Sequence, residues 1–225
     1  MIMRYYPVCL DVKGKRCLVV GGGAVGVRKA GTLLDCGAEV IVVSLDFHPA
    51  FDTLQKGNTR PLVLKRKAYD PGDLISMSLV IGATDNSDLN RRIGTDAAKQ
   101  NVLCNLVDLP EKSSFILPAV VSRGDLTLTV STSGTSPAFA KQLRKDLERQ
   151  FGNEYGEFLT LMGSIRKQLL AEGHAPDSHR AAFQSLIAGN LLALVAQKDH
   201  EAADRLLHDI LGPEYSIKEL LGGKP

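Results

Sequence analysis

The first half of the chain alternates between short apolar runs and longer stretches whose apolar residues recur at helical spacing. The apolar runs predict strands at 17–20, 40–43, 61–64, 79–83 and 102–107. The stretches between them predict helices at 24–36, 49–55 and 85–100. Strands buried on both faces of a parallel sheet are apolar throughout. The alternation therefore predicts an α/β fold, a Rossmann-type doubly wound parallel sheet.

The pattern changes after Pro110. Two strand-like runs, 115–122 and 126–131, are joined by Arg123-Gly124-Asp125. The second run alternates apolar with polar residues, which is typical of a half-exposed antiparallel strand. Two strands alone are marginally stable, so we expect this β-hairpin to pair with a second subunit.

The remainder of the chain has helical spacing, beginning at Pro137 with Ser136 as its cap. The predicted helices are 137–151, 154–171, 178–196, 199–211 and a short tail helix. The expected organisation is a nucleotide-binding domain at 1–112, a dimerisation hairpin with a loop at 113–147, and a C-terminal helical domain at 148–225.

Composition narrows the partners. The 225 residues are 44% hydrophobic and 23% charged, with a formal net charge of only +2. This balance indicates neither nucleic acid nor a membrane as partner. Four widely spaced cysteines without a C-x-x-C pair indicate reduced thiols, and the histidine spacing suits no metal site. We expect a soluble, cytoplasmic protein.

A glycine-rich turn, Gly21-Gly22-Gly23-Ala24-Val25-Gly26, stands between the first predicted strand and helix. In this context G-x-G-x-x-G predicts a dinucleotide site, with the pyrophosphate at the helix N-terminus. Gly21 would allow the tight turn, Gly23 the approach of the pyrophosphate, and Gly26 close packing of helix on strand. The alternative is a tight turn that binds no ligand.

Other candidates follow the later strands. Asp46 could bind the adenosine ribose, which would favour NAD over NADP, or it could cap the next helix. Asp108 could exchange protons with a substrate, or it could be a turn residue before Pro110. The expected cofactor-binding residues are Gly21, Gly23, Ala24, Val25, Gly26, Leu45, Asp46, Ala83, Thr84 and Asn105.

Taken in order, these landmarks resemble the precorrin-2 dehydrogenases, a module found alone or fused to a methyltransferase in siroheme synthases. The matching stretches are Tyr6-Pro7-Val8 with Leu10, the glycine turn with Arg28-Lys29-Ala30, Ala83-Thr84-Asp85 with Asn90, Cys104-Asn105-Leu106-Val107-Asp108, Ser114-Phe115-Ile116-Leu117-Pro118-Ala119, and Ser131-Thr132-Ser133-Gly134-Thr135-Ser136-Pro137-Ala138. They run from residue 6 to about 147, and the helical tail matches only in character.

The resemblance implies an NAD-dependent oxidation of precorrin-2 to sirohydrochlorin in siroheme biosynthesis, by a homodimer. Some members also insert ferrous iron, so ferrous or cobaltous ion is a possible second substrate. The resemblance makes Asp108 the catalytic residue and places Thr132, Ser133 and Ser136 in the tetrapyrrole cleft, although the family often has serine at the position of Thr132.

Because the tetrapyrrole carries carboxylates, we expect cationic side chains in its cleft to pair with them. Arg123, Lys141 and Arg144 are the candidates on the hairpin and the first tail helix. Each could instead be an ordinary solvated charge.

An NAD-sensing regulatory module without catalysis is the competing hypothesis. Such a module would need the glycine turn but would have no use for Asp108 or for the hydroxyl-rich loop at 131–136.

Overall fold

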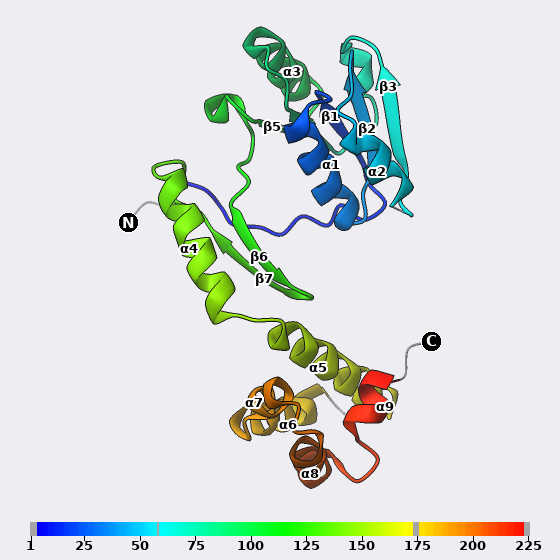
Figure 1. Ribbon diagram of the computed structural model, residues 1–225, viewed down its shortest axis with the longest axis vertical. Coiled ribbons are helices and arrows are strands. Elements are labelled where there is room, and N and C mark those ends of the chain that lie inside the picture. Colours follow the sequence, from blue (N-terminus) through cyan, green and yellow to red (C-terminus); the bar gives the residue numbers. More distant parts are fainter. Residues whose placement is uncertain (1–3, 58, 173–175, 223–225) are drawn as a thin grey trace. The chain divides into compact units, whose positions relative to one another are not determined.

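The computed structural model describes residues 4–57, 59–172 and 176–222, coloured along the chain in Figure 1. The chain divides into two compact units, residues 1–117 and 118–225. The further division of the second unit into a hairpin segment and a helical domain stays a prediction.

The first unit is built on a five-stranded parallel sheet in the order β3-β2-β1-β4-β5. Its strands are β1 (Arg16–Val20), β2 (Glu39–Ser44), β3 (Leu62–Arg66), β4 (Leu79–Gly82) and β5 (Leu103–Leu106). Val20 at the end of β1 pairs with Val43 on one side and with Gly82 on the other. The glycine turn therefore leaves β1 at the carboxyl edge between β2 and β4, where doubly wound folds bind their ligands. The predicted Rossmann-type fold is confirmed.

Helices cover both faces of this sheet. Successive residues of β1 alternate between two cores, with Cys17 and Val19 in one and Leu18 and Val20 in the other. The first core includes buried residues of α1 (Ala24–Asp35) and α2 (Ala50–Lys56), and the second those of α3 (Ser87–Lys99). Burial on both faces explains the apolar runs of β1, β2 and β4, whereas the edge strand β3 ends in the exposed Lys65 and Arg66.

The second unit begins with an antiparallel pair, β6 (Ala119–Arg123) and β7 (Leu126–Val130), against which α4 (Pro137–Gln150) packs. Ser136 caps α4 as predicted, because its hydroxyl accepts a hydrogen bond from the Phe139 amide. The predicted strand start at residue 115 is wrong. The Phe115 carbonyl instead accepts a hydrogen bond from the Asn105 side chain, beside β5.

The rest of this unit is helical around a core of its own. The helices are α5 (Glu154–Ala171), α6 (Pro176–Ala188), α7 (Leu191–Gln197), α8 (His200–Leu211) and α9 (Ile217–Gly222). The single helix predicted at 178–196 is wrong, because Asn190 has the left-handed φ of 64° and separates α6 from α7. No helix in the described parts of the chain is long and apolar enough to cross a membrane.

Candidate functional site

The glycine turn between β1 and α1 has no room for side chains at two of its predicted positions. Gly21 has a φ of +117°, and a Cβ there would lie 2.4 Å from the Ala83 carbonyl oxygen. A Cβ on Gly26 would lie 2.1 Å from the Gly21 carbonyl oxygen. Real Cβ contacts are never this short, so Gly21 permits the tight turn and Gly26 the close approach of α1, as the sequence predicts.

Gly23 differs, because a Cβ there would meet no atom within 4 Å. Gly23 is the N-cap residue of α1 and makes no side-chain cap, and the first turn of α1 carries no acidic residue. Within α1, the free N–H groups and the positive end of the helix dipole are therefore uncompensated by side chains. This is the arrangement that binds a pyrophosphate.

Gly22 also lacks room for a side chain, which the sequence did not predict. A Cβ there would lie 2.1 Å from the Asp46 carbonyl oxygen. Its amide donates to the Ser44 hydroxyl at 2.9 Å, and its carbonyl accepts from the His48 amide at 2.8 Å. These bonds fix the turn to the loop after β2. Ser44, a hydroxyl residue at the end of β2, is the sequence feature that could have indicated this contact.

A cavity of about 800 Å³ opens beside this turn. The residues that line it are Val20, Gly21, Gly22, Gly23, Ala24, Val25, Val43, Ser44, Leu45, Asp46, Lys67, Ala68, Tyr69, Ala83, Thr84, Asp85, Asn86, Leu89, Arg92 and Val107. All of the predicted cofactor-binding residues except Gly26 and Asn105 are among them. Pockets that bind cofactors commonly have about this size, so the cavity fits an extended dinucleotide.

Asp46 lines the cavity and does not cap a helix, because α2 begins at Ala50 with Pro49 as its N-cap. Its carboxylate accepts a hydrogen bond from Arg66 at 2.7 Å, and the same guanidinium nitrogen donates to the Leu45 carbonyl at 2.9 Å. The Asp46 side chain is 92% exposed. An exposed ion pair contributes at most about 1 kcal/mol, so Asp46 remains available to a ribose hydroxyl.

Tyr69 and Arg92 also line the cavity, and neither was predicted from the sequence. Tyr69 is buried, and its hydroxyl donates to Asp96 at 3.3 Å. Burial and the neighbouring Asp96 carboxylate raise the pKa of Tyr69, so the phenol stays neutral. The Arg92 guanidinium lies 5.9 Å from the centre of the Tyr69 ring.

Asp108 follows β5, and its side chain is exposed. One carboxylate oxygen accepts from the Asn90 amide at 2.8 Å, and the other accepts from the Ser87 hydroxyl at 3.0 Å. Both donors lie on α3, so these bonds connect the carboxylate to a helix and not to the turn before Pro110. An exposed carboxylate in a fixed orientation can take a proton from a bound substrate.

Asn105 is buried, and its amide donates to the Phe115 carbonyl at 3.0 Å. It is not among the residues that line the cavity. The contact between Asn105 and the cofactor therefore stays a prediction, and the bond that Asn105 makes is to the segment after β5.

The hydroxyl-rich loop lies in the second unit, between β7 and α4. The Thr132 hydroxyl accepts from the Ser136 amide at 3.1 Å, and Ser133 has a left-handed φ of 53°. The hydroxyls of Thr132 and Ser136 each accept a backbone amide, which leaves their hydroxyl hydrogens to serve as donors. The loop is thus an ordered set of donors suited to carboxylates.

The three candidate cations differ in their surroundings. Arg123 donates to the carbonyls of Ser122, Glu148 and Phe151, two of them at the C-terminal end of α4. Arg144 pairs with Glu148, one turn along the same helix. Lys141 is exposed. Arg123 therefore connects β6 to the C-terminal end of α4 by hydrogen bonds. Of the three candidates for binding substrate carboxylates, Lys141 is the one whose side chain is exposed.

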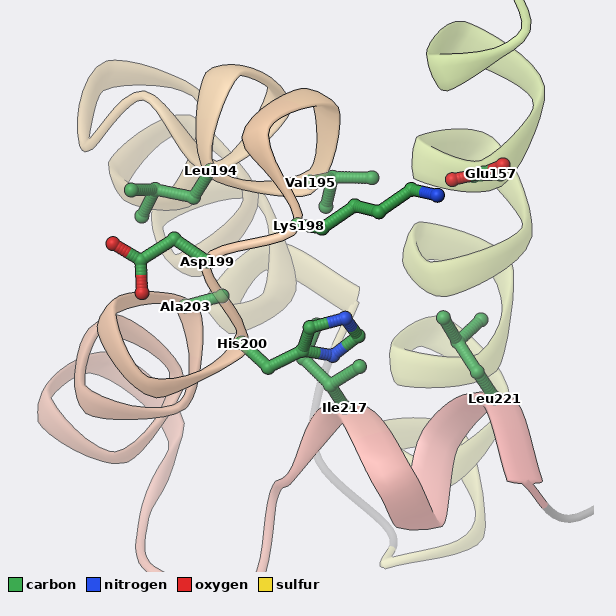
Figure 2. Close-up of a pocket in the computed structure, with 9 residues that line it drawn as sticks. All are labelled: Glu157, Leu194, Val195, Lys198, Asp199, His200, Ala203, Ile217 and Leu221. Carbon is green, nitrogen blue, oxygen red and sulfur yellow. The ribbon is translucent and has the colours of Figure 1, made fainter.

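A smaller cavity, of about 310 Å³, lies among the helices of the second unit. Figure 2 shows its lining, with Lys198 extending toward Glu157 and His200 beside Ile217. The described residues contain no group of three or more His, Cys, Asp or Glu side chains that could hold a metal ion.

Family models match two stretches of the chain. Residues 8–119 match the model described as "Putative NAD(P)-binding", and residues 123–150 match "Sirohaem biosynthesis protein central". The first model covers most of the first unit, and the second covers β7, the hydroxyl-rich loop and α4.

Similar proteins of known name agree with these family models. Siroheme synthase 2 of Pectobacterium atrosepticum is 35% identical over 205 residues, 91% of this chain and 44% of the relative. Siroheme synthase of Methylobacillus flagellatus is 31% identical over 228 residues, 99% of this chain and 48% of the relative. The chain thus spans less than half the length of these relatives.

A solved structure resembles nearly the whole chain. SirC, a precorrin-2 dehydrogenase, superposes with a TM-score of 0.74 at 26% identity and covers 90% of this chain and 98% of its own. Both family models, the relatives and this structure agree. The chain therefore belongs to the family that includes the siroheme synthases and the precorrin-2 dehydrogenase SirC.

Proposed function

We propose that this protein oxidises precorrin-2 to sirohydrochlorin with NAD in siroheme biosynthesis. The observation that carries the proposal is the pairing of two features at one sheet edge. A dinucleotide-sized cavity surrounds the open N-terminus of α1, and the Asp108 carboxylate is held in a fixed orientation after β5. Family membership supports this choice of substrate and cofactor.

The dinucleotide would be held by the backbone of the glycine turn and by Asp46. The amides of the α1 N-terminus would bind the pyrophosphate, and Asp46 would accept hydrogen bonds from the adenosine ribose. When bound, the dinucleotide supplies the acceptor for the hydride that the substrate loses.

The oxidation also releases a proton, and Asp108 is the group that we assign to accept it. Its carboxylate is exposed, so a hydrogen bound to a nitrogen or a carbon of the substrate can reach it. Thr132, Ser133 and Ser136 would donate hydrogen bonds to the carboxylates of the tetrapyrrole, and Lys141 would add a positive charge.

Anaerobic incubation of the purified protein with precorrin-2 and NAD tests the proposal. We expect NADH and sirohydrochlorin to appear together in equal amounts. The absorbance of each product measures its formation. Binding of NAD without turnover of precorrin-2 would contradict the proposal and would support a regulatory NAD-sensing module.

We also propose that the protein acts as a homodimer in the cytoplasm.

We further propose that ferrous or cobaltous ion is a second substrate. Metal insertion requires a base for the pyrrole protons, and the exposed Asp108 carboxylate is suited to this step. The test compares the rate at which sirohydrochlorin takes up ferrous or cobaltous ion with and without the protein. Equal rates would remove the metal as a substrate.

A further inference from the structure

Asn90 is a polar residue in the core of the first unit. It lies on α3, and its exposed fraction is 0%. Burying an amide without hydrogen bonds is unfavourable, so the partners of Asn90 indicate why it is there. The apolar neighbours of the same helix, Ile93 and Ala97, pack into the sheet core without this cost.

The Asn90 side chain makes three hydrogen bonds, two of them to Thr84. Its oxygen accepts from the Thr84 hydroxyl at 2.8 Å, and its nitrogen donates to the Thr84 carbonyl at 3.0 Å. A flipped amide would place its oxygen against two acceptors, the Thr84 carbonyl and an Asp108 carboxylate oxygen. These two contacts fix which end of the amide is the nitrogen, since a hydroxyl can pair with either end.

The remaining donor of that nitrogen is directed at Asp108, 2.8 Å from one carboxylate oxygen. Ser87, one turn earlier on α3, donates to the other oxygen at 3.0 Å. Asp108 is exposed, whereas the amide that orients it is buried. The carboxylate is thus accessible from solvent while Asn90 and Ser87 fix its orientation.

The end of β4 is shaped to accommodate this amide. A Cβ on Gly82 would lie 3.3 Å from the Asn90 oxygen and 2.7 Å from a methyl carbon of Leu106. The glycine therefore leaves the space that the amide needs between β4 and α3. Strand, helix and amide form a rigid support of the kind that functional groups require.

We propose that Asn90, with Ser87, is a positioning residue for the catalytic carboxylate of Asp108 and that Thr84 sets the orientation of the Asn90 amide. This role rests on the function proposed above, in which Asp108 accepts a proton. Asn90 is fully buried and does not line the cavity, so in this role it acts through Asp108.

A double-mutant cycle on turnover tests the proposal. Asn90→Leu should lower kcat about 10- to 100-fold, the scale of a misplaced catalytic group, while the Kd for NAD changes by less than about threefold. In an Asp108→Ala background the same change should lower the residual kcat less than about twofold, because the group on which Asn90 acts is gone. Equal losses in both backgrounds would contradict the proposal.

Ser87→Ala provides a second variant that does not disturb the core, since Ser87 is exposed. It should lower kcat about threefold to tenfold and should lose this effect in the Asp108→Ala background. Thr95→Ala is the matched control, because the Thr95 hydroxyl lies on the same helix but bonds to the Arg91 carbonyl. A Ser87→Ala enzyme as fast as wild type and Thr95→Ala would count against the proposal, even if Asn90→Leu failed to fold.

An NMR measurement tests the contact without any turnover. The two protons of the Asn90 side-chain nitrogen should give separate signals that exchange slowly with solvent, and Asn90→Leu identifies them by their loss. Asp108→Ala should shift one signal and leave the other, which is bonded to Thr84. An unchanged spectrum would contradict the positioning role. A wild-type protein inactive with precorrin-2, by contrast, would overturn the proposed function.

Discussion

Gly23 differs from the other glycines of the turn in what a side chain would meet there. At Gly21, Gly22 and Gly26 a Cβ would clash with backbone atoms, whereas at Gly23 it would enter open space. Substitutions at the first three positions would disturb the fold of the turn. Gly23 is therefore the position at which ligand binding can be blocked while the fold is kept.

We predict that Gly23→Asp abolishes NAD binding, because its carboxylate would occupy the cavity and repel the pyrophosphate. Calorimetric titration with NAD should show a loss of affinity of at least about 100-fold, and the far-UV circular dichroism should not change. Gly163→Asp is the control, since a Cβ on this α5 glycine also meets open space. Retained NAD affinity in Gly23→Asp would refute the assigned site.

Asp46 and Arg66 together give a prediction about cofactor choice. Arg66 bonds to Asp46 in the cavity wall, and an arginine at this site can bind the 2′-phosphate of NADP once the carboxylate is removed. Asp46→Ala should lower the preference for NAD over NADP, measured as a ratio of Kd values, by about tenfold or more. Adding Arg66→Ala should remove the gain in NADP affinity. An unchanged ratio in Asp46→Ala would exclude Asp46 from the ribose site.

At the scale of elements, β4, α3 and β5 meet around Gly82, the last residue of β4. Its missing side chain accommodates Leu106 of β5 and Asn90 of α3 at the same time. The packing of the core and the geometry behind Asp108 therefore depend on one position.

Gly82→Ala should destabilise the protein by about 1 to 3 kcal/mol, the usual cost of overpacking a core, and should also lower turnover by displacing Asn90. Thermal unfolding and kcat are the measurements. Gly31→Ala is the control, because a Cβ there meets only a Leu54 methyl carbon at an ordinary 3.7 Å. In an α-helix this control should be neutral or stabilising by up to about 1 kcal/mol. A Gly82→Ala protein as stable and as fast as wild type would contradict the packing argument.

At the scale of the whole molecule, the two-stranded β6–β7 sheet and the helix α4 that packs on it leave apolar side chains exposed. Val120 on β6 is 46% exposed and Phe139 on α4 is 55% exposed. Two-stranded sheets gain stability from further packing, which supports the proposal that a second copy covers this unit.

Sedimentation equilibrium at micromolar concentration should give the mass of a dimer. Val120→Glu should shift the protein toward monomer, because a charge in an apolar interface is costly, and should leave NAD binding unchanged. Leu170→Glu replaces another exposed apolar residue of the same unit and should stay dimeric. A monomeric wild-type protein would overturn the proposal.

The sequence by itself determined the fold of the first unit and predicted a cofactor site at its glycine turn, beside which the cavity lies. Continuous apolar strands, the glycine turn and the capping residue Ser136 are local signals, and each was found where its local chemistry requires it. It was less informative for α6 and α7, because only the left-handed conformation of Asn190 separates two stretches that are helical in composition.

Only the tertiary structure decided which side chains meet. The contacts of Asp108 with Asn90 and of Asp46 with Arg66 join residues 18 and 20 positions apart. The same holds for the Gly22 amide, which donates to the Ser44 hydroxyl at the end of β2. It also holds for the Arg123 guanidinium, which donates to the Glu148 carbonyl on α4. Local patterns are set by neighbours along the chain, whereas these contacts depend on how strands and helices pack, and packing is a property of the folded unit.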